Sequence, residues 1–361
     1  MVAITGFSDT TTDELRHVIE HLEGNHGDTL VFIADAAATS GHWVNEVAVL
    51  ELEPERVVLD LIGAHGSLRH EIPFSEPIAD MTGLQIQLFG LITQAREANP
   101  DAPMTSIETE LHGRAAIPTH VVTVAHARKV GETMVEVTLV GLDAPVRGGD
   151  EFWYLMVPQP QARDVIGDGF AIGQLESIPE DRRPMGASYT TRRRRPEAGE
   201  LDLWIHLHHD TGVAGWAATA TVGDTVALWG PRVAYDPPEG TTHHLLVADE
   251  TGVPAAAAIA ESLPTDHPVT LIAEIGAPGH ELPIRVDTNV DVRWVYRSDD
   301  GGRLPETVAA LDLDTDGLYA FGAGESREIS AIRRHLRRER GMTADAVHMT
   351  GYWRRGRDEA S

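Results

Sequence analysis

The sequence contains no cysteine. This absence excludes disulfides, thiolate zinc sites and a cysteine-ligated iron–sulfur cluster within the chain. Any redox chemistry must therefore use a bound organic cofactor, or a metal held by histidine and carboxylate side chains. No pair of side chains stands out as an acid–base dyad, and we assign neither a catalytic nor a metal-ligating residue.

Positive charge is scarce. The chain has 29 Lys and Arg against 56 Asp and Glu, a formal net charge of −27. So acidic a protein is a poor partner for nucleic acid or an anionic membrane, because phosphate binding needs clustered positive charge. The same imbalance makes one short basic stretch informative, "SYTTRRRRP" at 188–196.

Long apolar runs are also missing. No stretch approaches the roughly 18 residues of a membrane-spanning helix, and the N-terminus lacks a signal-peptide pattern. We therefore expect no membrane insertion and a cytoplasmic location. The 361 residues, 42% of them hydrophobic, are enough for two or three domains with real cores.

Residues 1–98 are predicted to form an α+β domain. Helical periodicity with a Thr/Asp start covers 10–38, strand-like alternation covers 45–63, and a second helical pattern covers 81–98. The following segment, 99–118, is polar, contains proline and shows little periodicity. We interpret it as a linker.

Residues 119–235 change to short alternating strands separated by Gly, Pro and Asp turns, which indicates an antiparallel barrel or sandwich. One strand, "LDLWIHLHH", places its leucines and isoleucine on one face. The opposite face is polar enough to wall a ligand and carries Asp202, Trp204, His206 and His208.

From 236 to 361 the pattern becomes strand–helix–strand, which is typical of a parallel sheet covered on both faces. Such sheets bind ligands at the carboxyl ends of their strands. In this chain those ends are predicted at Asp249–Thr251, Arg297, Gly322–Glu325 and Gly351–Trp353.

Three turns carry weak ligand signals. In "ADETGVPAA", Pro254 suits a first helical turn whose free N–H groups attract anions, although a capped helix start without a ligand is the alternative. In "FGAGES", Arg327 stands where a dinucleotide fingerprint has its third glycine. In "HHDTGVAGWAAT", Asp210 or Thr211 would cap a small helix, and Trp216 is by default a core residue.

The arginine run allows two interpretations. A solvated, charge-balancing stretch explains Arg193–Arg195 as well as a ligand site does. Arg192 differs, because alternation from Tyr189 carries it to the side opposite Thr191. One of the two faces must therefore bring a polar group inward.

The order of these motifs resembles a known family more than any single motif does. "SYTTR", "LHHDTGVAGWA", "VGDTVALWGPR", "ADETGVPAAAAIAESLP", "VRWVYR", "AFGAGESREISAIRRHL" and "GYWRRG" follow the order and spacing of the siderophore-interacting proteins, the ViuB-like FAD-dependent ferric-siderophore reductases. The resemblance covers roughly 119–357. It implies a ferredoxin-reductase-like β-barrel that binds FAD at 119–235, and a parallel α/β domain that binds NAD(P)H at 236–361.

The resemblance also implies site residues. The flavin ring would lie on the Tyr-Thr strand, its ribityl-pyrophosphate on the Gly/Trp helix, and the nicotinamide near the sheet edge. The cofactor-binding set is Tyr189, Thr190, Thr191, Arg192, His208, Asp210, Ala214, Trp216, Asp249, Glu250, Thr251, Gly324, Glu325, Tyr352 and Trp353. A basic doorway for an anionic ferric chelate would use Arg193, Arg194, Arg195 and Arg354.

Two positions depart from the family pattern. Ala187 stands where the family usually has an arginine aimed at the pyrophosphate, and Val213 replaces the proline of the Gly/Trp helix. Lost charge-assisted hydrogen bonds would weaken FAD binding by on the order of 1.5–3 kcal/mol, or about 10–100-fold. We expect FAD to bind loosely and to be lost on purification.

The implied activity is reduction of a ferric siderophore through FAD, with NADH or NADPH as donor and release of Fe(II). Ferredoxin is an alternative donor. Arg297 could meet the 2′-phosphate of NADPH or be an ordinary surface arginine. A non-catalytic siderophore carrier, and a flavin reductase with an organic acceptor, are alternative functions.

The N-terminal stretch "HLEGNHGDTL" resembles part of the small domain attached to haem-utilisation proteins. A haem-linked oxidoreductase or a haem-binding protein is therefore a further alternative. His21 and His26 would lie roughly 140° apart around a helix, which is poor for one shared metal. His26 alone could ligate haem, but a structural role is the interpretation we favour, and we assign no site there.

Overall fold

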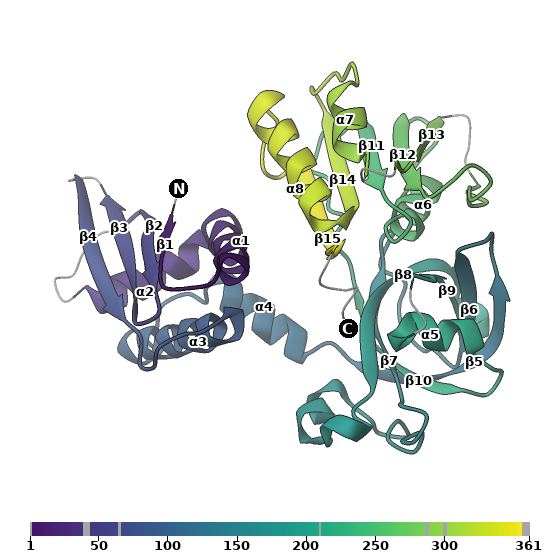
Figure 1. The fold of residues 1–361 in the computed structure, drawn as a ribbon, viewed down its shortest axis with the longest axis horizontal. Coiled ribbons are helices and arrows are strands. Elements are labelled where there is room, and N and C mark those ends of the chain that lie inside the picture. Colours follow the sequence, from purple (N-terminus) through teal and green to yellow (C-terminus); the bar gives the residue numbers. More distant parts are fainter. Residues whose placement is uncertain are drawn as a thin grey trace. The chain divides into compact units, whose positions relative to one another are not determined.

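The structure is a computed structural model that describes residues 2–38, 44–63, 66–208, 211–285, 289–298 and 302–355. It divides into two compact units, Met1–Ala116 and Ile117–Ser361 (Figure 1). No helix within the described residues is long and apolar enough to cross a membrane.

The first unit is an α+β domain, as the sequence predicts. Its sheet has the order β1-β2-β3-β4, with β1 parallel to β2 and the other neighbours antiparallel. Its elements are β1 (Ala3–Ile4), α1 (Asp9–Asn25), α2 (Gly27–Ala37), β2 (Glu46–Glu53), β3 (Arg56–Gly63), β4 (Gly66–Pro73), α3 (Met81–Ala98) and α4 (Ser106–Ala115).

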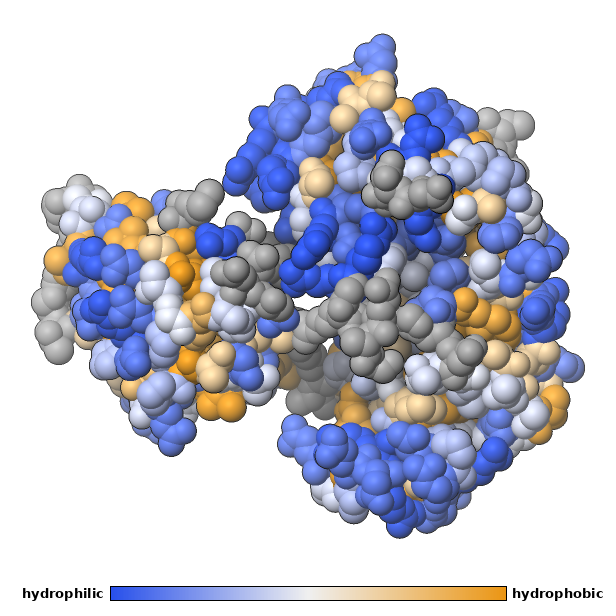
Figure 2. All heavy atoms as spheres, in the orientation of Figure 1, coloured by the Kyte–Doolittle hydropathy of each residue, from blue (hydrophilic) through white to orange (hydrophobic). Residues whose placement is uncertain are grey.

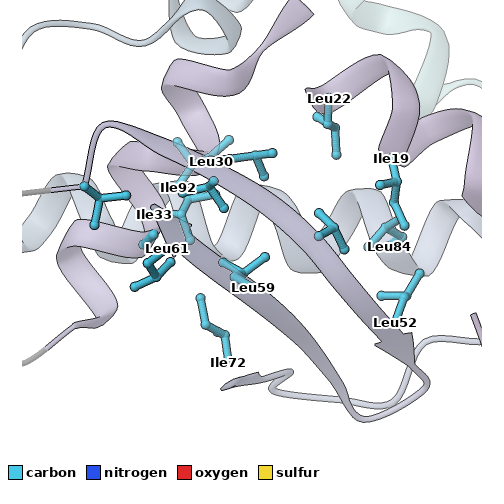
Figure 3. Close-up of a cluster of buried hydrophobic side chains, with 14 of the residues drawn as sticks. Ile19, Leu22, Leu30, Ile33, Leu52, Leu59, Leu61, Ile72, Leu84 and Ile92 are labelled. Atoms are coloured by element: carbon cyan, nitrogen blue, oxygen red, sulfur yellow. The ribbon is translucent and has the colours of Figure 1, made fainter. Parts of the chain in front are cut away.

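Helices and sheet of this unit share one core. Leu30 and Ile33 of α2 pack with Leu59 of β3 and with Leu84 and Ile92 of α3, and all of them are buried (Figure 3). The stretch expected as one helix over 10–38 is instead two. The backbone leaves helical geometry at His26 (φ −132°, ψ 33°), whose N–H still bonds to the Leu22 carbonyl and ends α1.

The predicted linker contains a helix that its weak periodicity did not indicate. α4 is held by a long-range ion pair, in which Nη2 of Arg96 lies 2.7 Å from Oε2 of Glu108. Hydrogen bonds from Arg96 outweigh burial and lower the pKa of Glu108 to about 2. Ile107 joins the core of the unit. The helix therefore depends on tertiary contacts more than on its own pattern.

The second unit begins with an antiparallel barrel, which confirms that part of the predicted fold. The strands close in the order β10-β5-β6-β9-β8-β7, with β10 pairing to β7. Leu201, Leu203 and Ile205 point into the barrel core, as the alternation of this strand predicts. The elements are β5 (Thr119–Lys129), β6 (Met134–Val140), β7 (Phe152–Val157), η1 (Ile172–Ser177), η2 (Glu180–Arg182), β8 (Met185–Arg195), η3 (Pro196–Ala198), β9 (Glu200–His206), α5 (Gly212–Thr219) and β10 (Thr225–Arg232).

A parallel sheet of order β13-β12-β11-β14-β15 follows, also as predicted. One hydrophobic cluster joins α6 to one face of the sheet, and a second joins α7 and α8 to the other. The elements are β11 (His243–Ala248), α6 (Val253–Ser262), β12 (Val269–Ile275), β13 (Val290–Tyr296), α7 (Leu304–Ala309), β14 (Leu318–Glu325), α8 (Ser326–Arg334), the π-helix η4 (His335–Glu339) and β15 (Val347–Trp353).

An ion pair between a buried arginine and a partly exposed glutamate joins the barrel to α6. Nη1 of Arg192 donates to Oε2 of Glu261 at 2.8 Å, and its second Nη donates to the other carboxylate oxygen. The same guanidinium lies 4.4 Å from the ring centroid of Trp204. Arg192 is only 4% exposed.

Hydrophilic residues cover most of the visible face of the second unit, whereas the visible face of the first unit carries more hydrophobic residues (Figure 2). The exposed hydrophobic side chains of the first unit include Ile86 and Phe89 on α3.

Candidate flavin and donor site

A pocket of about 700 Å³ lies where the barrel meets the carboxyl ends of the parallel strands. Its volume falls in the range of small-molecule and cofactor sites. Its walls come from the first half of β8, the end of β9, the start of α5 and the sheet edge. The lining residues are Met185, Gly186, Ala187, Ser188, Tyr189, Thr190, Trp204, His206, His208, Thr211, Gly212, Val213, Ala214, Glu250, Thr251, Pro254, Arg297, Tyr352 and Trp353.

The β8 wall is small and uncharged up to its aromatic residue. Residues 186–188 are glycine, alanine and serine, so the backbone lies open to a flat ligand. Tyr189 and Thr190 continue this wall. Burial raises the pKa of Tyr189, so its phenol stays neutral. The sequence placed these two residues correctly beside a pocket.

The β9 wall is the polar face that alternation predicts. Trp204, His206 and His208 line the pocket, and the two imidazoles stack with centroids 5.6 Å apart. Burial lowers the pKa of His206 to about 4, and the positive charges of His208 and Arg297 add to the effect. His206 is therefore neutral at physiological pH and can serve as donor or acceptor.

The start of α5 faces the same pocket through Thr211, Gly212, Val213 and Ala214. Thr211 is the extended N-cap residue, and its side chain makes no capping hydrogen bond to the helix. A helix N-terminus presents backbone N–H groups and the positive end of the helix dipole, which together suit an anion. Asp210, the other predicted cap, lies outside the described residues.

The sheet edge contributes Glu250, Thr251, Arg297, Tyr352 and Trp353. Nη2 of Arg297 donates to Glu250, and its Nε lies 3.2 Å from Oε1 of Glu274, whose side chain is 1% exposed. Burial raises the pKa of Glu250, and the charge of Arg297 opposes that shift. The Arg297 guanidinium, for which a 2′-phosphate contact and an ordinary surface role were both open, thus pairs with two carboxylates of the chain.

Behind this edge, Asp249 accepts hydrogen bonds from two directions. Its Oδ1 takes the Thr251 N–H at 2.9 Å and the Thr251 hydroxyl at 2.6 Å, and its Oδ2 takes the Glu325 N–H at 2.9 Å and Trp353 Nε1 at 2.6 Å. The carbonyl of Asp249 takes the Val253 N–H at 2.9 Å. The expectation that the N–H groups before Pro254 are free is therefore wrong: the capped helix start is what the chain forms.

The turn between β14 and α8 also has backbone N–H groups that bond to a carboxylate of the chain. Oε2 of Glu325 accepts the N–H groups of Arg327 and Glu328 at the start of α8, at 2.8 and 3.0 Å. A side chain on Gly324 would lie 2.8 Å from the Asp249 carboxyl group. Asp249, Gly324 and Glu325 therefore shape the edge from behind and do not line the pocket.

The arginine run lies outside the pocket. Arg194 pairs with Glu151 at 3.0 Å, both side chains being almost fully buried. Arg195 pairs with Asp202, whose pKa burial alone would raise; the Arg195 and Thr138 hydrogen bonds outweigh burial and lower it. Arg193 is exposed. This geometry does not support the predicted basic doorway, since two of its members serve buried carboxylates instead.

Thr191 and Arg192, at the centre of β8, are both buried. The pairing of β8 with β9 shifts register between Thr191 and Arg193. Thr191 accepts Trp153 Nε1 at 2.9 Å within the barrel, while Arg192 reaches Glu261 on α6. The alternation argument correctly required a buried polar group, but neither of these two residues lines the pocket.

Two other predicted site residues, Trp216 and Arg354, also lie outside the pocket lining. Trp216 packs against the barrel core, which is its default interpretation, and Arg354 is partly exposed. Nδ1 of His26 lies 2.9 Å from the Ser106 hydroxyl, a contact that joins the start of α2 to α4. This contact favours the structural interpretation of His26, while the side chain of His21 lies outside the described ones.

Sequence reasoning missed the carboxylates that hold the arginines. Glu151 and Glu261 lie 43 and 69 residues from their partners. A lone glutamate on a helix or strand carries no local signal for such a pair. It also missed that Glu325 caps α8 and that Asp249 holds the turn before α6, although Glu325 directly precedes α8 and Asp249 lies four residues before α6.

Comparison with known proteins identifies the second unit. Residues 123–235 match the family model of the siderophore-interacting FAD-binding domain, and residues 241–356 match that of the siderophore-interacting protein. The chain belongs to the siderophore-interacting protein family. Its barrel is therefore a FAD-binding domain, and its fold is that of the ferredoxin-reductase-like flavoproteins.

Named relatives agree. The ferric vibriobactin reductase ViuB of Vibrio cholerae is 28% identical over 238 residues, covering 64% of this chain and 87% of ViuB. The NADPH-dependent ferric-chelate reductase of Escherichia coli is 26% identical over 213 residues, covering 57% and 80%. The crystal structure of a siderophore utilization protein from T. fusca superposes with a TM-score of 0.58 at 27% identity, covering 66% of this chain and 93% of that one.

The pocket fits FAD by its own features. A flat ring needs a wall without projecting side chains, which the small residues of β8 supply. A pyrophosphate needs backbone donors, and the start of α5 presents them in the same pocket. Both family matches lie in the second unit, and the haem-related resemblance of the first unit stays a prediction.

Proposed function

We propose that this protein is a FAD-dependent ferric-siderophore reductase that takes its electrons from NADH or NADPH. One observation carries the proposal: a single pocket is walled on one side by the FAD-binding barrel and on the other by the carboxyl edge of the α/β sheet. The names of the Vibrio and Escherichia relatives support ferric reduction and, for the latter, NADPH as donor.

In this proposal β8 and β9 hold the flavin ring. Tyr189 and Thr190 lie against it, and neutral His206 hydrogen-bonds to its polar edge without placing a charge there. The N–H groups at Gly212 and Ala214 receive the pyrophosphate. Ala187 and Val213 supply no charge and no rigidity there, so we expect FAD to bind weakly.

Bound FAD supplies the conversion of one two-electron donation into single electrons. One dihydronicotinamide gives up a hydride and becomes a pyridinium. Two ferric chelates each gain one electron and become ferrous, and one proton is released. The protein contributes by holding donor and acceptor in contact and by excluding water. No side chain needs to act as an acid or base.

Oxygen-donor siderophores hold Fe(III) far more tightly than Fe(II), so reduction alone releases the metal from an intact chelator. Arg192, Arg194 and Arg195 pair with carboxylates, and we therefore do not propose these three as chelate-binding residues. Which siderophore is used, and release of Fe(II) in the cytoplasm, stay predictions.

The test is an anaerobic visible spectrum of the full-length protein reconstituted with FAD. NADPH or NADH should bleach the flavin band at about 450 nm, and a ferric siderophore should restore it. Bleaching without recovery would point to an organic acceptor. No bleaching by either nucleotide, but bleaching by reduced ferredoxin, would replace the donor. Quenching of tryptophan by the ferric chelate without any flavin redox change would indicate a carrier.

A further inference from the structure

The sheet has a single place where its strand order reverses, between β11 and β14. In open α/β sheets, ligands bind outside the carboxyl ends of the strands at such a switch point. The two strand-to-helix turns that flank it here are the α6 turn after β11 and the α8 turn after β14. A dinucleotide held in the usual way would direct its pyrophosphate to N–H groups of these turns.

The N–H groups of the α6 turn are already used. Thr251 and Gly252 donate to Oδ1 of Asp249, and Val253 donates to the Asp249 carbonyl. Pro254 has no N–H to offer. The Ala255 N–H bonds to the Gly252 carbonyl at 3.0 Å. Within 251–255, which the structure describes in full, every backbone donor therefore has an acceptor from the chain itself.

Three N–H groups of the α8 turn are used in the same way. The N–H of Glu325 goes to Oδ2 of Asp249, and those of Arg327 and Glu328 go to the Glu325 carboxylate. Asp249 and Glu325 thus make the hydrogen bonds that two phosphate groups would otherwise make. Each of these two residues is at most 4% exposed.

The two turns also approach each other closely. A side chain on Gly252 would lie 2.1 Å from the Ala323 carbonyl oxygen, so the two turns touch through their backbones. A side chain on Gly351 would lie 2.4 Å from the Ser326 hydroxyl. These contacts leave no gap between the turns for a phosphate group.

The charge at this edge is unfavourable to a second anion. Glu250, Glu274 and Glu328 lie beside Asp249 and Glu325, and their cationic partners are Arg297 and Arg355. Burial, the largest cause, together with the neighbouring carboxylates Glu274, Glu325 and Asp249, raises the pKa of Glu328 to about 7 against the opposing charge of Arg355. The like-charge part of this shift comes from carboxylates that a pyrophosphate at this edge would also meet.

We infer that Asp249 and Glu325 fill the two anion positions at the switch point, so that the hydride donor is recognised by its dihydronicotinamide ring and not by its phosphates. This inference rests on the proposed function. The redox step is unchanged: the ring loses a hydride and becomes a pyridinium, and the hydride with one solvent proton reduces the bound flavin. Reduced nicotinamide mononucleotide, NADH and NADPH are then equivalent donors.

The first test measures binding without turnover. ADP-ribose and adenosine 2′,5′-bisphosphate, the phosphate-bearing parts of the dinucleotides, are titrated calorimetrically into the FAD-loaded full-length protein at low salt. We expect no saturable binding up to about 1 mM. A dissociation constant below about 0.1 mM for either compound would overturn the inference.

The second test compares donors. Anaerobic flavin reduction by NADPH, NADH and reduced nicotinamide mononucleotide should proceed with kcat/KM values within about threefold of one another. A phosphate clamp is worth about 10–100-fold, so a tenfold or larger deficit for the mononucleotide would overturn the inference. If none of the three donors reduces the flavin, the proposed function fails instead, while the calorimetry still decides the role of Asp249.

A variant pair tests the residue itself. Asp249→Ala frees the Thr251 and Glu325 N–H groups and removes one negative charge, so ADP-ribose should bind at least about tenfold more tightly than to the wild type. Asp316→Ala removes the same charge from an exposed site of this domain and should change nothing. Equal affinities in a folded Asp249→Ala and Asp316→Ala would contradict the inference. If Asp249→Ala does not fold, the wild-type titration decides.

Discussion

The barrel wall and the sheet wall of the pocket differ in how their helix starts are held. On the barrel side, the first residues of α5 line the pocket, and the Thr211 side chain makes no capping hydrogen bond to the helix. On the sheet side, Asp249 holds the turn before α6 and Glu325 caps α8. A helix start is thus proposed as a ligand site at one wall, whereas at the other wall it is held by carboxylates of the chain.

Charge follows the same division. Three arginines of β8, Arg192, Arg194 and Arg195, lie outside the pocket lining and pair with carboxylates, so they add no free positive charge to the flavin side of the pocket. The sheet side gathers more carboxylates than guanidiniums. An anionic cofactor suits the first wall, and a donor recognised by a neutral ring suits the second.

The largest effect is expected where the two walls are joined. Arg192→Met should lower the free energy of unfolding by about 3 kcal/mol, because it removes two charge-assisted hydrogen bonds to Glu261 and the guanidinium contact with Trp204. Urea denaturation measures this loss. Arg193→Met, its exposed neighbour in the same run, should stay within about 0.5 kcal/mol of the wild type. Similar losses in both variants would mean that the pair does not join the walls.

The carboxylate edge should make stability depend on pH. The pKa of Glu328 is raised to about 7, above its ordinary value of 4.5, so its protonated form favours the folded state. This stabilisation is complete below pH 4.5 and is lost as the pH rises through 7, a fall of roughly 3 kcal/mol. Urea midpoints at about pH 5 and pH 8 test it.

Glu328→Gln should flatten that profile, because an amide cannot ionise. Glu306→Gln, an exposed glutamate on α7, should keep the wild-type profile. A steep profile that persists in Glu328→Gln would assign the pH dependence to another group of the edge.

The neutrality of the barrel wall can be tested by adding a charge. Ala187→Arg should tighten FAD binding by about 10–100-fold, because it restores a charge-assisted hydrogen bond to the pyrophosphate. Titration followed by flavin fluorescence measures the dissociation constant. Ala218→Arg adds the same charge to an exposed position of α5 outside the pocket lining and should have little effect. Equal gains would mean that overall charge, not the wall, limits binding.

The smallest effect concerns the backbone at the start of α5. Gly212 has φ +63°, a left-handed conformation that a β-branched residue adopts at a cost of about 1–2 kcal/mol. Gly212→Val should therefore weaken FAD binding by about tenfold. Gly223→Val introduces comparable strain at φ +94°, away from the pocket lining, and should leave FAD affinity unchanged. If both variants lose FAD equally, the start of α5 is not the phosphate site.

Local pattern predicted most elements of the fold. The range expected for the last N-terminal helix coincides with α3, and the alternation of β9 assigned its inner and outer faces correctly. The pattern failed where stability comes from distant partners. α4 is held through Arg96 and the core, and the break at His26 depends on a single backbone geometry.

The residues of the site also fall into those that the sequence predicted and those that it did not. Tyr189, Thr190, His208 and Ala214 lie in the pocket as the family motifs imply, since each belongs to a short segment whose local structure is strongly specified. The roles of the arginines in the run could not be predicted from the sequence. An arginine that binds a ligand and one that pairs with a glutamate of the chain have the same local sequence pattern. Only the positions of Glu151 and Glu261 decide between the two.

The amino-acid sequence by itself determined the two types of sheet, the absence of thiol chemistry and the family of the second unit, because these depend on composition and short-range periodicity. The tertiary structure alone decided that Asp249 serves the fold. Its carboxylate meets donors 76 and 104 residues further along the chain. No local pattern encodes such a meeting, since it exists only when separate strands end at one edge.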